Sequence, residues 1–141
     1  KSMKQISNHW GKQVSATSHP HGEQVRARCS KDFPDYKAQQ SFIGRKEASY
    51  GEKGSVRPDY YKEGHSVDIK NYNIENSSGR SNLARNIEKQ YNQRVDNLPE
   101  GTKQSVLIDI RGQNVSDADL NALYNNIKNR TNNEVEIIFK M

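Results

Sequence analysis

The segment from Gln104 to Arg111 (QSVLIDIR) constrains the fold most, because it is a nearly continuous apolar run. A strand with one exposed face alternates apolar and polar residues, whereas a strand covered on both faces does not. We therefore predict that this segment is a buried strand within a sheet.

The elements around this strand predict a mixed α/β fold. The sequence is strand-like from Ser41 onward, a stretch that includes Glu47, and strands are expected over residues 42–43, 56–61, 66–74, 104–111 and 134–139, with a hairpin turn at 62–65. One helix is expected from Ser81 or Asn82 to about Val95, with Leu83, Ile87, Gln90 and Arg94 on its inward stripe. A second begins at Ser116, where Asp119 stands at the capping-box distance. Because strands come first and an αβαβ order follows, we expect a mixed sheet flanked by helices.

The length of 141 residues predicts a single domain. Residues 1–40 are expected to form a polar N-terminal segment, with a helix from Gly22 to about Lys31, and residues 41–141 to form the core. The only cysteine, Cys29, excludes an internal disulfide and zinc clusters of three or four cysteines. No apolar run approaches the length of a membrane span and no signal peptide is visible in these residues, and the start at Lys1 leads us to expect a fragment of a longer polypeptide.

The net charge of +5 favours a polyanionic partner such as nucleic acid, although an acidic protein would also suit it.

The candidate catalytic residues lie in the two strands that the hairpin joins. Asp59 follows Pro58, and Asp68 and Lys70 stand two residues apart, so they point to the same side of a strand. Two carboxylates can hold a divalent cation, and an ammonium group can stabilise negative charge or the nucleophile.

Two observations limit the weight of this pattern. A triplet of the form Asp-x-Lys also occurs at Asp35 to Lys37, in polar sequence without a strand pattern. The three charged residues could equally form a solvated face of the sheet. Spacing alone therefore leaves both interpretations open.

The segment from Gly51 to Met141 resembles the PD-(D/E)xK nuclease superfamily, which has the restriction-endonuclease-like fold. Pro58-Asp59 and Asp68-Ile69-Lys70 match its core motif, although Asp68 replaces the commoner glutamate. Further segments look like the C-terminal nuclease domains of bacterial polymorphic toxins and contact-dependent growth inhibition proteins. These are Arg57-Pro58-Asp59, Lys70-Asn71-Tyr72, Leu98-Pro99-x-Gly101-Thr102 and Asp109-Ile110-Arg111-Gly112-Gln113.

The resemblance implies that Asp59, Asp68 and the carbonyl of Ile69 bind the metal, and that Lys70 positions or activates the attacking water. An acidic residue on the first helix would complete the site, with Glu23 as the candidate and Glu47 as its rival. Gln90 matches a glutamine that many members place beside the site. Mg²⁺ suits such an oxygen site, Mn²⁺ could replace it, and Zn²⁺ is conceivable because His65 is near.

The resemblance further implies a toxin domain that is secreted or displayed as part of a larger protein. It would cleave DNA in the cytoplasm of a target bacterium and be neutralised by a cognate immunity protein. Binding of the phosphate backbone would fall to basic side chains, for which the candidates are Arg57, Lys62, Arg85, Lys89 and Arg94.

Three alternatives stay open. The same fold could cleave tRNA or another RNA, since both substrates present the same phosphodiester. The protein could be a basic nucleic-acid-binding module without activity. A metal-independent ribonuclease could instead use His9, His19 and His21, because histidine moves protons at neutral pH.

Overall fold

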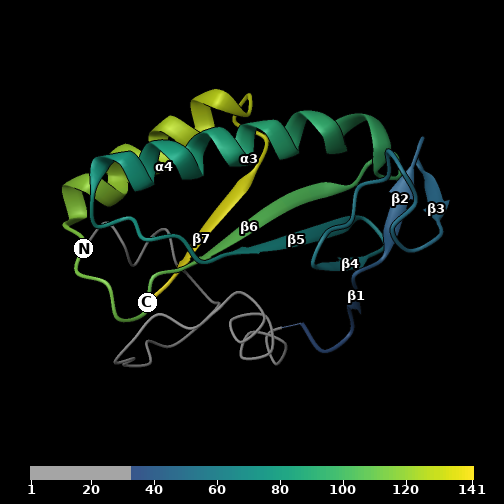
Figure 1. Cartoon of the computed structure of the whole chain (residues 1–141), viewed down its shortest axis with the longest axis horizontal. Coiled ribbons are helices and arrows are strands. Elements are labelled where there is room, and N and C mark those ends of the chain that lie inside the picture. The colour runs from purple at the N-terminus through teal and green to yellow at the C-terminus, as the bar shows by residue number, and fades with distance from the viewer. Residues whose placement is uncertain (1–32) are drawn as a thin grey trace.

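The computed structural model describes residues 33–141, which form a mixed α/β fold. Figure 1 shows a sheet with helices α3 (Ser77–Asn97) and α4 (Asp117–Arg130) packed on it. The strands are β1 (Lys37–Ala38), β2 (Ser41–Ile43), β3 (Lys46–Ala48), β4 (Tyr60–Lys62), β5 (His65–Lys70), β6 (Lys103–Asp109) and β7 (Glu136–Lys140). The predicted mixed α/β class is confirmed.

The main sheet has five strands in the order β1-β4-β5-β6-β7. Strands β5, β6 and β7 run parallel, whereas β4 is antiparallel to both β5 and β1. Two parallel neighbours need a crossover between them, and α3 and α4 supply the two crossovers. Strands β2 and β3 form a separate two-stranded hairpin, which Figure 1 places at one end of the sheet.

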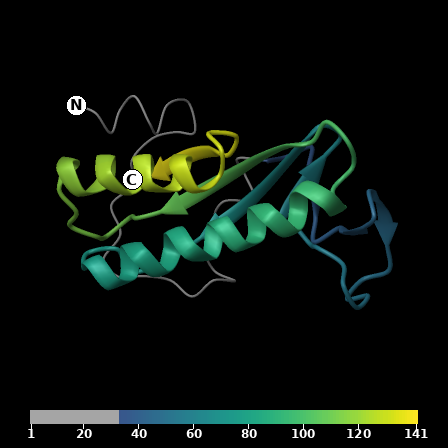
Figure 2. The same cartoon turned by 90° about the horizontal axis from the view of Figure 1, so that it is seen from above.

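The main core lies between the sheet and the two helices. Figures 1 and 2 show α3 and α4 side by side on the same face of the sheet. From the helices, Leu83 and Ile87 of α3 and Leu120 of α4 join this core, and their side chains are almost fully buried. Val106 and Ile108 of β6 face them from the sheet. The core is contiguous across both helices, so the face of β6 that carries Val106 and Ile108 is covered by them.

The opposite face of the sheet carries a second apolar cluster. Leu107 of β6 and Ile138 of β7 belong to it, with Val67 of β5, Phe33 and Tyr60. Leu107 has no exposed surface, and Val106 is only 5% exposed. Successive residues of β6 are thus buried on opposite faces, which confirms the prediction from its continuous apolar run.

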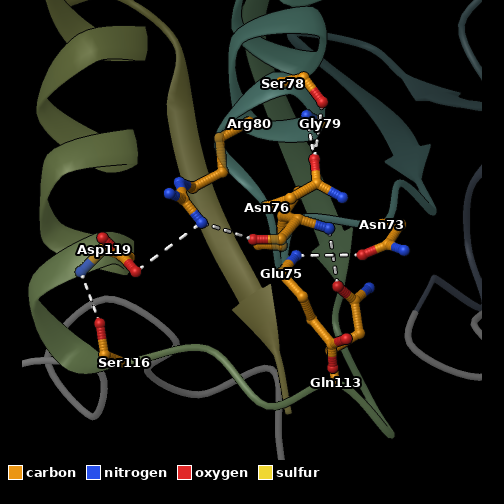
Figure 3. A network of polar contacts seen from close by, with 10 residues as sticks. Asn73, Glu75, Asn76, Ser78, Gly79, Arg80, Gln113, Ser116 and Asp119 are labelled. Carbon is orange, nitrogen blue, oxygen red and sulfur yellow. Dashed lines mark hydrogen bonds and ion pairs between the residues drawn. The ribbon is translucent and has the colours of Figure 1, made fainter.

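Helix α3 begins earlier than the sequence predicted, at Ser77 and not at Ser81 or Asn82. The reason is the cap: the Asn76 Oδ1 atom accepts hydrogen bonds from the Gly79 amide at 2.7 Å and the Ser78 hydroxyl at 2.8 Å. Figure 3 shows Asn76 in this position, beside the loop that carries Asn73. Since residues 73–82 include several Asn and Ser residues, several positions could have served as the cap.

Gly79 lies in a position that has no room for a side chain. A Cβ atom there would lie 1.9 Å from the Asn73 carbonyl oxygen and 3.2 Å from Asn76 Oδ1. Alanine normally stabilises a helix relative to glycine by about 1 kcal/mol. We expect Gly79→Ala to reverse that sign and lower the free energy of unfolding by about 1–3 kcal/mol, as overpacking does. Urea unfolding would measure the loss, with Ser81→Ala, at an exposed position of the same helix, as the control. A Gly79→Ala variant as stable as the wild type would contradict the prediction.

The cap of α4 agrees with its prediction, because Ser116 Oγ accepts a hydrogen bond from the Asp119 amide at 3.1 Å. Strand β1 was not predicted, β3 lies in the stretch that is strand-like from Ser41 onward, and the strand expected over 56–61 starts only at Tyr60. The helix expected over 22–31 lies outside the described residues. Within residues 33–141, neither helix has both the length and the apolar character that crossing a bilayer requires.

Candidate active site

Asp68 and Lys70 lie on the face of β5 that meets α3. Along α3, Asn86, Gln90 and Arg94 are spaced four residues apart, so they form a polar row on one side of the helix. This row interrupts the apolar face of the helix and lies against the two charged residues of β5. The interface between α3 and β5 is therefore polar, whereas α3 contributes apolar side chains to the core with β6.

The Lys70 ammonium is held by two amide oxygens. Its Nζ donates hydrogen bonds to Asn86 Oδ1 at 2.7 Å and to Gln90 Oε1 at 2.6 Å. Burial lowers the pKa of Lys70 to about 8, and the negative charge of Asp59 opposes that shift. The side chain is only 8% exposed, so its two amide partners replace the water that an ammonium group needs.

The two carboxylates are joined through the backbone of their strands. Asp59 directly precedes β4, and its Oδ2 accepts a hydrogen bond of 2.8 Å from the Ile69 amide. The Asp59 amide donates in turn to Asp68 Oδ1 at 3.3 Å. Gln39 Nε2 donates to Asp59 Oδ1 at 3.2 Å. The antiparallel pairing of β4 and β5 thus brings both acids to one place, as the hairpin predicted.

Arg94 forms an ion pair with Asp68 Oδ2, and both side chains are about one-tenth exposed or less. The Arg94 Nη2 atom also donates to the Arg57 carbonyl at 3.2 Å. Burial lowers the pKa of the guanidinium to about 10, against the influence of the Asp59 carboxylate, so Arg94 is charged at neutral pH. A buried carboxylate requires such a partner, and Arg94 is that partner for Asp68.

The donors around Asp59 and Asp68 fit a hard divalent cation in part. Mg²⁺ is commonly held by one or two carboxylates, with waters and substrate phosphates in its other positions. Among residues 33–141, no three His, Cys, Asp or Glu side chains come together as a metal cluster. Asp59 and Asp68 offer two carboxylates, and oxygen donors of this kind suit Mg²⁺ or Mn²⁺ better than Zn²⁺.

The other proposed ligands do not join this group. Glu23 lies outside the described residues, as do His9, His19 and His21. Glu47 is exposed on β3, where its carboxylate accepts a hydrogen bond from Gln40 at 3.3 Å, and it forms no cluster with the two aspartates.

His65 contacts polar side chains other than the two aspartates. Its Nδ1 lies 2.5 Å from the Tyr36 hydroxyl, and its Nε2 lies 2.6 Å from Ser105 Oγ, which donates to Glu136 at 2.7 Å. Since Ser105 uses its proton for Glu136, Nε2 carries the imidazole proton and Nδ1 accepts from Tyr36. Burial lowers the pKa of His65, with Glu136 opposing the shift. The histidine therefore belongs to a polar chain across the sheet, and it is not a candidate zinc ligand of the aspartate pair.

The basic residues expected to bind phosphate divide into two groups. Four of them are exposed, namely Arg57, Lys62, Arg85 and Lys89. Arg94 is buried, so it cannot serve as an open phosphate contact while it is paired with Asp68. Asn86 was not anticipated, although its position one turn before Gln90 on the same helix face would have indicated it.

Two further motif residues have structural partners. Gln113 donates from Nε2 to the Tyr72 carbonyl at 2.7 Å and accepts from the Ile74 amide at 2.8 Å, so it fastens the segment after β5. Figure 3 shows Gln113 beside Asn73 and Glu75. Asp109 and Arg111 form a buried ion pair at the end of β6. These contacts stabilise the carboxyl ends of β5 and β6, just beyond Lys70.

In comparisons with known proteins, no protein-family model, curated protein or solved structure matches the chain.

Proposed function

We propose that this domain is a metal-dependent endonuclease with a restriction-endonuclease-like core. One observation carries the proposal: Asp59, Asp68 and Lys70 come together from the β4–β5 hairpin, with Gln90 bonded to the lysine. The order of a hairpin, α3, β6, α4 and β7 is compatible with that fold. A merely solvated charged face is disfavoured, because Asp68 and Lys70 are only 7% and 8% exposed.

Asp59, Asp68 and the Ile69 carbonyl would hold the cation, with Mg²⁺ as the first choice. When bound, the cation would supply Lewis-acid stabilisation of the phosphoryl oxygens. Asp59 is partly exposed whereas Asp68 and Lys70 are buried, so a substrate phosphate would approach from the side of Asp59. The Ile69 amide holds Asp59 Oδ2, and the Asp59 amide holds Asp68 Oδ1, so the carboxylates are oriented before substrate arrives.

Lys70 would orient the attacking water and stabilise negative charge as it develops on the phosphate. Its Nζ has three positions for hydrogens, and Asn86 and Gln90 use two of them. The third direction is left for water or a phosphate oxygen. Gln90 and Asn86 would act as positioning residues, because they fix the lysine head group and do not need to touch the substrate.

We infer further that the substrate is DNA of a target bacterium and that a cognate immunity protein blocks the domain in the producing cell. The supporting features are the resemblance to polymorphic toxins, the net charge of +5 and the exposed Arg57 beside the site. Cleavage of RNA and not of DNA would favour the RNA-cleaving alternative. The proposed catalytic mechanism would be unchanged.

The direct test is incubation of the purified chain with plasmid DNA and with total RNA, with EDTA or with added Mg²⁺, Mn²⁺ or Zn²⁺. We expect cleavage with Mg²⁺ or Mn²⁺ and none with EDTA, because the two carboxylates would lack the cation. Re-addition of Mg²⁺ in excess should restore the rate. Cleavage that persists in EDTA would contradict the proposal and favour the histidine-based ribonuclease.

A further inference from the structure

Tyr50 lies on a turn that is fixed by its own backbone. The Glu52 amide donates to the Ser49 carbonyl at 3.0 Å, and the Ser55 amide donates to the Glu52 carbonyl at 3.0 Å. Gly51 adopts a φ of +75°, in the left-handed region that favours glycine. The turn therefore holds Tyr50 in a defined place at the surface.

Tyr50 is 73% exposed, and it is one of two exposed large hydrophobic residues in the described part of the chain. The guanidinium carbon of Arg57, itself exposed, lies 4.4 Å from the ring centroid. This is a cation–π contact, in which the planar guanidinium covers part of the ring. The two side chains are thus in contact, and both residues are exposed.

This surface is attached to the candidate active site. Arg57 stands two residues before Asp59, and its carbonyl accepts the hydrogen bond from Arg94, the ion-pair partner of Asp68. Val56 exchanges two backbone hydrogen bonds of 2.8 Å with Phe42, which fixes the chain just before Arg57. A group bound on Tyr50 and Arg57 would thus be held by the same backbone segment that leads into Asp59 and contacts Arg94.

Nucleobases stack on aromatic rings and on arginine planes without regard to sequence, and alanine substitution of such a ring weakens binding measurably. In a duplex both faces of each base are already stacked on neighbouring bases. Only a nucleotide that has left the stack, or that was never paired, can place a face on a protein ring.

We propose that Tyr50 and Arg57 form a stacking subsite for an unpaired nucleotide beside the scissile phosphodiester. Single strands and single-stranded loops would then bind better than regular duplex, and duplex DNA would be cut most readily where a nucleotide has left the stack. This inference rests on the proposed function, and it specifies which form of nucleic acid that site accepts.

The test measures binding in EDTA, where the proposed reaction cannot proceed. Labelled single-stranded DNA, single-stranded RNA and duplex DNA of equal length are titrated with the full chain, and the single strands carry a fluorescent adenine analogue that stacking quenches. We expect tighter binding of single strands than of duplex, with quenching. Tyr50→Ala should weaken single-strand binding about tenfold and abolish the quenching, and duplex affinity should not change.

Two matched variants separate stacking from apolar contact. Tyr50→Phe keeps the ring and should retain the affinity, whereas Tyr50→Leu keeps the apolar bulk and should behave like Tyr50→Ala. The single strand that binds more tightly, DNA or RNA, identifies the class of substrate. Either outcome supports the subsite. Equal losses for single strands and duplex, or full affinity in Tyr50→Leu, would overturn it.

A parallel cleavage assay keeps the two proposals apart. Metal-dependent cleavage that is the same in wild type and Tyr50→Ala on single strands would refute the subsite and leave the nuclease proposal standing. Quenching that depends on Tyr50, without cleavage under any metal, would refute the nuclease and support the binding site alone.

Discussion

Lys70→Met should lower the rate of phosphodiester cleavage by about a hundredfold to ten-thousandfold, the range typical of losing a group that handles protons or charge in the transition state. Methionine keeps the length of the side chain but has no ammonium group to meet the water or the phosphate. Initial rates on plasmid DNA at saturating Mg²⁺ would measure the effect. Asp68→Asn should lose activity to a comparable degree, because the amide removes one anionic ligand.

The matched control is Lys46→Met, which replaces an exposed lysine of β3 outside the site and should cleave at the wild-type rate. Loss of Lys70 also leaves the side-chain oxygens of Asn86 and Gln90 without their lysine donor, so folding must be checked by circular dichroism and thermal unfolding. A folded Lys70→Met variant with wild-type activity would remove Lys70 from the mechanism.

The sequence predicted the parts of the site that follow from local periodicity. Alternation along residues 66–70 placed Asp68 and Lys70 on one face, and β5 has them both against α3. The helical spacing placed Gln90 and Arg94 on the inward stripe, where the structure has them in contact with those residues. Periodicity therefore predicted which side chains face each other across the helix–sheet interface.

Periodicity did not predict which partner each side chain takes. Arg94 was expected to contact phosphate, but in the structure its guanidinium pairs with Asp68, because this part of α3 packs against β5. Tertiary packing decides such a pairing, and no spacing within either element encodes it. Strand β1 was missed because it has only two residues, both exposed, and therefore no apolar pattern. Strand β3 lies in sequence that was strand-like but was not predicted as a separate strand, because its three residues are also largely exposed.

Arg94→Met should lower the free energy of unfolding by about 3–5 kcal/mol in EDTA, because it leaves the Asp68 carboxylate buried without its ion-pair partner. The double variant Asp68→Asn with Arg94→Met should recover much of that loss, since it removes the uncompensated charge. Urea unfolding of wild type, the two single variants and the double variant gives the coupling energy between the two residues. A loss in the double variant equal to the sum of the two single losses would give a coupling energy near zero and show that the ion pair does not matter for stability.

The same variants test whether the ion pair and the cation use the same carboxylate. Arg94 and a bound Mg²⁺ would both compensate the charge of Asp68, so removal of Arg94 should strengthen Mg²⁺ binding. A ligand at a hundred times its dissociation constant stabilises the folded state by about 2.7 kcal/mol. We therefore expect added Mg²⁺ to raise the unfolding midpoint more in Arg94→Met than in wild type, and not at all in the double variant. Equal shifts in all three proteins would place the cation away from Asp68 and refute the proposed metal site.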